Sequence, residues 1–136
     1  MDKSLNYLAL ARKAGRVELG EEPVGAAAKA LTACLVIVAD DAGDHTWRRA
    51  KSFVSGTRQI SLRVPYTKDD LGRSIGRTAL AMAAFTDPAL ALGFVQSLPE
   101  PCPEVVESLR ERVEDDRKRQ QQAKAHRKIG RKGRKT

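Results

Sequence analysis

Apolar residues recur at helical spacing near the start of the chain. Leu5 and Leu8 lie three residues apart, with alanines around them, and predict a first helix. Ser4 suits the N-cap of this helix because its hydroxyl can accept a hydrogen bond from a first-turn amide. Gly15 follows at the position where a left-handed residue often ends a helix. The pattern therefore predicts a helix over most of residues 4–14.

The pattern changes to an unbroken apolar run at Cys34–Ala39 (CLVIVA). Such a short, β-branched run is typical of a strand that is covered on both faces. Helices are expected on either side of it, over about residues 20–32 and 44–56. Two shorter segments of alternating character predict further strands, at residues 17–19 and 59–63.

The same alternation continues in the second half of the domain. Asp44 and Thr67 are the expected N-caps of two helices. Thr78–Phe85 (TALAMAAF) is rich in alanine, which favours helix, but its short length and its flanking turn residues favour a strand. Asp87 is then the expected N-cap, and Pro88 the first residue, of the last helix of the domain.

Helices and strands thus alternate through residues 1–98, which we take as one domain. Alternation of this kind places helices on both faces of a central sheet. The predicted fold class is α/β, a three-layer α/β/α sandwich around a small four-stranded mixed sheet, followed by a charged C-terminal extension. Prolines at 99, 101 and 103 mark the boundary. We expect an acidic linker or short helix over 99–116 and a basic, disordered tail over 117–136.

The net charge of +8 is concentrated at the end of the chain. Residues 1–98 hold 13 Lys/Arg and 10 Asp/Glu, and residues 99–116 hold 2 and 7. Residues 117–136 hold 10 Lys/Arg and no acidic residue. A run of cations attracts polyanions, and contacts to RNA phosphates release condensed counterions. A solubilising or membrane-surface tail is the alternative, but the segment lacks the apolar face of an interfacial helix.

Composition gives little support to several other classes of protein. No stretch approaches the ~20 apolar residues of a membrane span, and the N-terminus does not resemble a signal peptide. Cys34 and Cys102 match neither a disulfide framework nor a metal site. The histidines at 45 and 126 have no partners at the spacing of a catalytic triad. We therefore expect a cytoplasmic protein that is not an enzyme and needs no cofactor or metal.

Asp40 and Asp41 are one candidate for chemistry. They follow the buried strand, where open α/β sheets often place a ligand. One interpretation is a metal-dependent phosphotransfer site. The other is that the two acids cap a turn, and this is favoured because no third acid or partner lysine is evident at a second strand end.

A group of cations near the first helix is another candidate. Arg12, Lys13 and Arg16 leave that helix shortly before Gly20 opens the next one. Because a helix N-terminus offers free backbone amides to an anion, these residues could form a phosphate-facing corner. An ordinary solvated helix end is the alternative explanation.

Three stretches of the chain are similar to one family. They are LARKAGRVELGEE within residues 8–22, CLVIVADDAGDHT at 34–46 and LGRSIGRTALAMAAFTD at 71–87. Together they resemble the superfamily of ribosomal proteins that includes the large-subunit proteins seven-Ae and thirty-e and the small-subunit protein twelve-e, in its bacterial branch. The resemblance covers about residues 4–98, in order and without large gaps.

The resemblance implies an α/β/α sandwich that binds kink-turn RNA, a sharply bent internal loop. A bend of this kind opens the groove so that short side chains reach base edges, which regular A-form RNA hides. The family binds with the start of the second helix, in a Gly-x-Asn-Glu-x-x-Lys pattern, and with the loop before the last strand. In this chain the corresponding RNA-binding positions are Gly20, Glu21, Glu22, Ile75, Gly76, Arg77 and Thr78.

The chain departs from the family pattern at three positions of the second helix. Glu22 stands in place of the asparagine, Pro23 in place of the glutamate and Ala26 in place of the lysine. A glutamate only accepts hydrogen bonds and repels phosphate, whereas an asparagine both donates and accepts. Lys29, three residues after Ala26, could replace part of the missing charge.

The resulting hypothesis is a non-catalytic, ribosomal-protein-like protein that docks on structured RNA. A kink-turn or ribosomal RNA is the expected ligand, and the ribosome or the transcription and translation machinery is the expected setting. The basic tail would add affinity through Arg127, Lys128, Arg131 and Lys132. The alternative is a protein-interaction adaptor on the same fold, in which Glu21 and Glu22 meet basic side chains of a partner.

Overall fold

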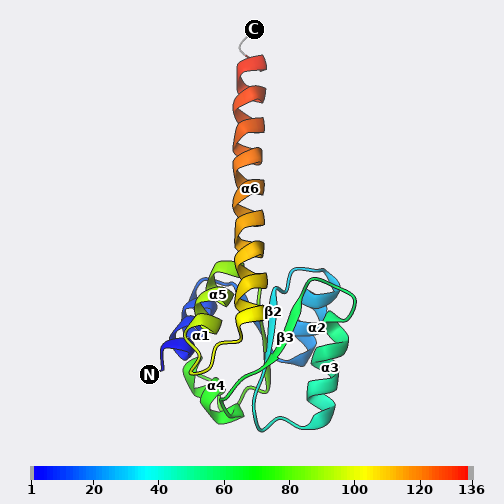
Figure 1. Cartoon of the computed structure of the whole chain (residues 1–136), viewed down its shortest axis with the longest axis vertical. Helices are drawn as coiled ribbons and strands as arrows, with labels where there is room; N and C mark the ends of the chain where they lie inside the picture. The colour runs from blue at the N-terminus through cyan, green and yellow to red at the C-terminus, as the bar shows by residue number, and fades with distance from the viewer. Residues whose placement is uncertain (1, 135–136) are drawn as a thin grey trace.

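The structure is a computed structural model that describes residues 2–134, with side chains described for residues 2–125. Four strands form one mixed sheet in the order β1-β4-β2-β3 (Figure 1). These strands are β1 (Val17–Leu19), β2 (Leu35–Val38), β3 (Ile60–Arg63) and β4 (Met82–Phe85). Strand β4 is antiparallel to both of its neighbours, and β2 is parallel to β3. The predicted four-stranded mixed sheet is confirmed.

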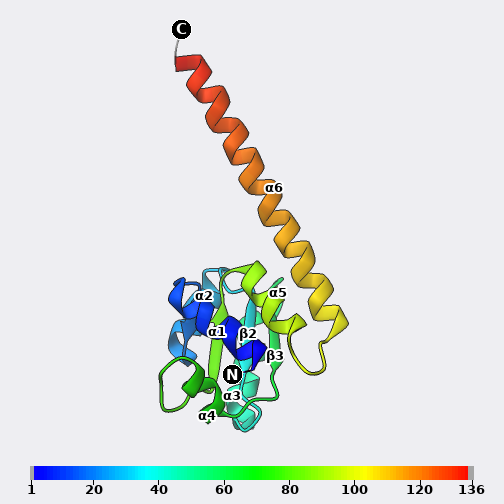
Figure 2. The same cartoon turned by 90° about the vertical axis from the view of Figure 1, so that its left-hand side faces the viewer.

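Helices cover both faces of this sheet, as the sequence predicted. On one face lie α2 (Glu21–Lys29) and α3 (Asp44–Val54). On the other lie α1 (Lys3–Lys13), α4 (Lys68–Ser74) and α5 (Pro88–Gln96). Figures 1 and 2 show the two groups of helices on opposite sides of the strands. The molecule therefore has the three-layer α/β/α architecture.

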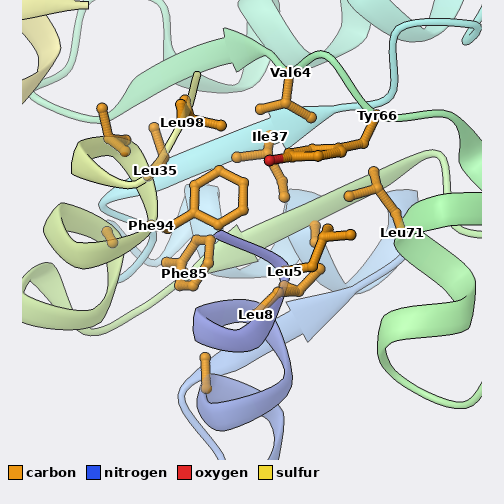
Figure 3. Packing of buried hydrophobic residues seen from close by; sticks show 14 of the residues in the cluster. Leu5, Leu8, Leu35, Ile37, Val64, Tyr66, Leu71, Phe85, Phe94 and Leu98 are labelled. Carbon is orange, nitrogen blue, oxygen red and sulfur yellow. The ribbon is translucent and has the colours of Figure 1, made fainter. Parts of the chain in front are cut away.

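The larger core lies between the sheet and the α1, α4 and α5 layer (Figure 3). At its centre Phe85 and Phe94 pack with ring centroids 5.2 Å apart and planes inclined by 47°. Leu35 and Ile37 of β2 face these rings, while the valines of β2 face α2 and α3. All four residues of β2 are buried, as the continuous apolar run predicted.

The alanine-rich segment forms a strand, but a shorter one than predicted. Only Met82–Phe85 pairs in the sheet, whereas the prediction covered residues 78–85. Residues before Met82 instead pass over α4, where the Leu80 N–H donates to the Lys68 carbonyl oxygen, 2.9 Å away. Strand β4 is an inner strand buried on both faces, so close packing outweighs the helical preference of alanine.

Three of the predicted helix-end signals are confirmed. Thr67 caps α4 through a reciprocal capping box with Asp70. The Asp87 carboxylate accepts a hydrogen bond from the Ala89 N–H at 2.8 Å and so caps α5. Gly15 has a φ of +68°, the left-handed conformation expected just after α1.

Other predicted helix ends are wrong. The N-cap of α1 is Asp2, whose Oδ1 accepts from the Ser4 N–H at 2.8 Å, and Ser4 lies buried in the first turn. Asp44 is the first residue of α3 and not its N-cap. Helix α2 ends at Lys29, earlier than predicted, because the chain turns through a left-handed residue at Leu31, with a φ of 61°.

The C-terminal extension differs most from its prediction. One helix, α6 (Pro103–Arg134), replaces the expected short helix and disordered tail. Its start packs against α5, with Leu109 buried, and its remainder extends away from the sandwich (Figures 1 and 2). Glu, Gln, Ala, Lys and Arg dominate its sequence, and these residues favour a helix once the first turns are anchored. At 32 residues, α6 is about 48 Å long.

Candidate nucleic-acid interface

The start of α2 and the segment before β4 meet at one end of the sheet. Gly20 follows β1 directly, and its N–H donates to the carbonyl oxygen of Met82, the first residue of β4, at 2.9 Å. Antiparallel pairing of β1 with β4 produces this neighbourhood. We call this the α2 end of the sheet. It carries both segments that the sequence singled out for RNA binding.

Glycine is required at the beginning of α2. Gly20 is the N-cap and has a φ of +98°, a conformation that L side chains rarely adopt. No side chain caps this helix start, so first-turn backbone amides point outward, apart from Pro23, which has none. Glu21 and Glu22 are both exposed. The Glu21 carboxylate forms an ion pair with Arg49 of α3, which offsets part of the negative charge here.

The second predicted segment is divided between core and surface. Ile75 is only 3% exposed and packs in the larger core, so its side chain does not face solvent. Gly76, with a φ of +75°, turns the chain outward. Arg77 and Thr78 are exposed, and the Arg77 N–H donates to the Gly72 carbonyl oxygen at 2.8 Å. Arg77 therefore provides a cation near the α2 end.

The cations of α1 lie at the other end of the sheet. The Arg16 carbonyl oxygen accepts a hydrogen bond from Thr86, just after β4, whereas Gly20 contacts the first residue of that strand. The four residues of β4 span about 13 Å. Arg12, Lys13 and Arg16 are exposed, but the structure does not bring them to the start of α2. The predicted phosphate-facing corner is therefore not formed.

Lys29 and the tail cations are also distant from the α2 end. Lys29 is exposed in the last turn of α2, at the opposite end of that helix from Gly20. Helix α6 leaves the sandwich beside the start of β3, where Arg58 contacts Asp115. The positions Arg127, Lys128, Arg131 and Lys132 belong to the part of α6 that extends away (Figure 1), and their side chains lie outside those described.

Asp40 and Asp41 have local roles in the turn after β2. The Asp40 N–H donates to the Tyr66 carbonyl oxygen at 2.8 Å. Asp41 Oδ1 accepts from the N–H of Lys68, the first residue of α4, also at 2.8 Å. Within the described residues, no three His, Cys, Asp or Glu side chains gather as a metal site would require. The capping interpretation therefore accounts for Asp41.

Cys34 is buried, and its surroundings disfavour the reactive thiolate form. Its Sγ donates to the Phe85 carbonyl oxygen at 3.0 Å. Burial is the main cause that raises the pKa of its thiol to about 12. Since the thiolate is the nucleophile, this residue has the environment of a structural cysteine.

A group of cations stacked on aromatic rings was missed by the sequence analysis. Lys51 Nζ lies 5.6 Å and Arg63 Cζ 5.4 Å from the centroid of the Trp47 ring. Arg49 lies over Phe53 in the same way, at 5.3 Å. The spacing of four residues between Trp47 and Lys51 on one helix could have indicated their contact. Arg63 joins them only because β3 lies beside α3. This contact could not be predicted without the order of the strands in the sheet.

Comparisons with known proteins support the fold. The sequence matches no protein-family model and no curated protein. A solved structure of a protein of unknown function from Bacillus halodurans is similar to it, with a TM-score of 0.67 and 27% identity over 74% of this chain and 100% of that chain. The 15.5kD RNA-binding protein of Giardia lamblia matches with a TM-score of 0.59 and 17% identity, over 80% of this chain and 86% of that one. The chain shares its fold with both proteins.

No helix in the described part of the chain is both long enough and apolar enough to cross a membrane.

Proposed function

We propose that this protein binds structured RNA without catalysing a reaction, and that a kink-turn is its preferred ligand. The observation that carries the proposal is the hydrogen bond between Gly20 and Met82, because it places the start of α2 beside the start of β4, the strand that follows the second candidate segment. The similarity in fold to an RNA-binding protein from Giardia lamblia supports RNA as the partner. Ribosomal RNA and a cytoplasmic, translation-related role are part of this proposal.

The α2 end offers three kinds of contact to a bent RNA. Gly20 has no side chain, so a backbone phosphate or base edge can approach closely. The exposed amides of the first turn of α2 can donate to phosphate oxygens. The exposed Arg77 supplies a guanidinium that can bind a phosphate or a guanine edge, and the Thr78 hydroxyl can donate or accept.

Acidic side chains limit the electrostatic attraction of this surface. Glu21 is paired with Arg49, but Glu22 lies exposed beside it, where it repels phosphate. A shape-dependent mode of binding is therefore more consistent with this end than a purely charge-driven one. The cations of α6 lie beyond the opposite end of the sheet and would contact a different part of the RNA.

Replacement of one cation at each end of the sheet tests which end binds. We expect Arg77→Gln to lower the affinity for a kink-turn by about ten- to a hundredfold, since one charge-assisted contact contributes about 1.5–3 kcal/mol. Arg16→Gln replaces another exposed arginine, at the other end of the sheet; it is the matched control and should leave that affinity nearly unchanged. Fluorescence anisotropy with a labelled kink-turn measures both. An equal effect of the two substitutions would remove the α2 end from the proposal.

A protein-interaction adaptor is the second candidate function. A groove between α2 and α3 is lined by Glu21, Glu22, Gly25, Arg49 and Phe53, and could accept a basic peptide. Affinity capture of the intact chain with and without nuclease distinguishes the two functions. Partners that persist after nuclease treatment favour the adaptor, and partners that disappear favour RNA.

A further inference from the structure

A pocket lies at the end of the sheet opposite Gly20. It is an open cavity of about 310 Å³ between the base of α6 and the turn that leads into β3. Its lining includes three arginines, Arg58 from the turn and Arg112 and Arg119 from α6, together with Leu31 and Gln59. We call it the arginine pocket. Figure 1 shows α6 passing this end of β2 and β3.

The charges around the arginine pocket are only partly balanced. Arg58 forms an ion pair with Asp115, and Arg119 lies 3.7 Å from Asp116. Arg112 forms no salt bridge with any side chain in residues 2–125, and its buried Nε has no hydrogen-bond partner there. Buried polar groups are normally satisfied, so Arg112 is the arginine of this pocket that the described side chains leave unpaired.

Gln59 adds a second unsatisfied group to the same cavity. Its side chain is 94% buried and is held in place because Nε2 donates to the Ala28 carbonyl oxygen at 3.1 Å and to Thr57 Oγ1 at 3.2 Å. Its Oε1, by contrast, has no donor among the described residues. Gln59 therefore gives the pocket a fixed lining residue beside its three arginines.

Leu31 forms an apolar rim beside these polar groups. Its side chain is 60% exposed, although leucine is usually buried, and its φ of 61° is in the left-handed region that disfavours residues with a Cβ. An exposed leucine at the mouth of a cavity gives a flat apolar group, such as a nucleobase, a surface to pack on. The arginines and the exposed leucine together match two parts of one nucleotide, its phosphate and its base.

We propose that the arginine pocket binds a backbone phosphate of an RNA strand, as a second RNA contact at the end of the molecule opposite Gly20. Arg58, Arg112 and Arg119 hold the phosphate. This inference rests on the proposed function, since it takes RNA as the ligand. The cations that follow along α6 would guide the strand away from the pocket.

The Arg58–Asp115 ion pair provides a test with a matched control. We expect Arg58→Gln to weaken binding of the full-length protein to a labelled short oligouridylate by about tenfold. The salt dependence should become less steep by about 0.7 for each phosphate that the variant no longer binds. Asp115→Asn breaks the same ion pair but leaves the pocket more positive, so binding should be unchanged or tighter. Thermal melts of both variants check that they fold.

The outcome separates an RNA site from a structural ion pair. Equal weakening by Arg58→Gln and Asp115→Asn would overturn the proposal, because the pair would then act only by holding α6. An Arg112→Gln variant that folds and binds like the wild type would also overturn it. Uridine monophosphate bound as tightly as the oligouridylate would assign the site to a free nucleotide and overturn the RNA claim.

The independence of the two sites is tested with the same probe. If kink-turn preference is absent while Arg58→Gln still weakens oligouridylate binding, the α2 proposal fails and the pocket stands. If the kink-turn preference is present but Arg58→Gln leaves oligouridylate binding unchanged, the proposal for the pocket alone is overturned.

Discussion

The carboxylate of Asp2 makes two contacts that hold the start of α1. Its Oδ1 accepts from the Ser4 N–H and from the Tyr66 hydroxyl, at 2.8 and 2.9 Å. Desolvation by burial acts to raise the pKa of Asp2, but the hydrogen bonds from Tyr66 and Ser4 outweigh it, and the net pKa is lowered. Ionised Asp2 therefore contributes stability above its ordinary value of 3.8, and this contribution is lost as the pH falls through the lower folded value.

Substitution of Asp2 tests this capping role. Asp2→Ala should reduce the free energy of unfolding by about 1 kcal/mol at neutral pH, the usual contribution of an N-cap. Asp2→Asn is the control, because asparagine caps a helix about as well but does not titrate. Chemical denaturation at pH 7 measures both variants. If Asp2→Asn proves as destabilising as Asp2→Ala, charge and not capping is responsible.

The two cysteines should differ in reactivity. Cys34 is buried with a thiol pKa of about 12, whereas Cys102 is half-buried near the start of α6. In a Cys102→Ser variant at pH 8, we expect Cys34 to react with a thiol reagent only after denaturant is added. Burial of Cys34 also makes the free energy of unfolding depend on pH, because the buried thiol favours its protonated form. This contribution to stability is present below pH 9, the ordinary pKa of a cysteine thiol, and declines as the pH rises toward the folded pKa of about 12. Rapid labelling of native Cys34 would contradict its burial.

At the scale of elements, contact between α4 and the segment before β4 fixes the position of Arg77. Gly72 lies in α4, and a Cβ at this residue would be 2.7 Å from backbone atoms of Ala79 and 2.9 Å from the Arg77 carbonyl oxygen. Backbone atoms cannot move aside as the end of a side chain can. The absence of a side chain at Gly72 is therefore what lets this segment pack closely on the helix.

Gly72→Ala should displace the 77–79 segment. We expect a loss of about 1–3 kcal/mol in the free energy of unfolding, the usual cost of overpacking, and a weaker affinity for a kink-turn. Gly43→Ala is the matched control: a Cβ there meets nothing within 4 Å, and φ is −70°, so little change is expected. Thermal melts and anisotropy titrations check both. A Gly72→Ala protein as stable as Gly43→Ala would contradict the close contact.

Elements whose signals are local in sequence could be predicted. The apolar run at Cys34–Ala39 and the Asp87-Pro88 cap identify a buried strand and a helix start without knowledge of the fold. Features that depend on tertiary contacts could not be predicted from the sequence. Asp2 became a cap because Tyr66, far along the chain, also binds it, and the strand is shorter than predicted because the Leu80 N–H donates to Lys68 of α4.

The candidate site was predicted in part for the same reason. Gly20 and Arg77 are marked by local patterns, and the order β1-β4-β2-β3 brings their segments to one end. The same order separates Arg16 from Gly20, which no spacing in the sequence reveals. The arginine pocket joins Arg58 to α6 residues more than 50 positions later, a contact that only the packing of α6 produces.

At the scale of the whole molecule, shape and charge are arranged along one axis. The α2 end carries the predicted kink-turn surface with its acidic residues, and α6 extends from the opposite end with the cations of 117–134. A small ligand bound at the α2 end therefore does not contact α6. Only a ligand large enough to reach both ends, such as a folded RNA, contacts both. If the proposed function is correct, this arrangement lets the protein hold two segments of one folded RNA.

Neutralising the far part of α6 tests its contribution to affinity. Replacement of the seven Lys/Arg residues of 120–136 by glutamine keeps good helix formers in place and leaves the arginine pocket intact. We expect weaker RNA binding at low salt and a less steep salt dependence, by about 0.7 for each single-strand phosphate that these cations bind in the wild type. The melting temperature should not change. An unaltered salt slope would show that these cations do not contact RNA.

The central claim is that the folded body recognises the shape of an RNA and not only its charge. The most direct measurement is an anisotropy titration of the full-length protein against a labelled kink-turn and a straight duplex of equal length, at low and at physiological salt. We expect the kink-turn to bind more tightly at both, with a preference that grows as salt weakens the contribution of α6. Equal affinity for the two RNAs at physiological salt would contradict this account.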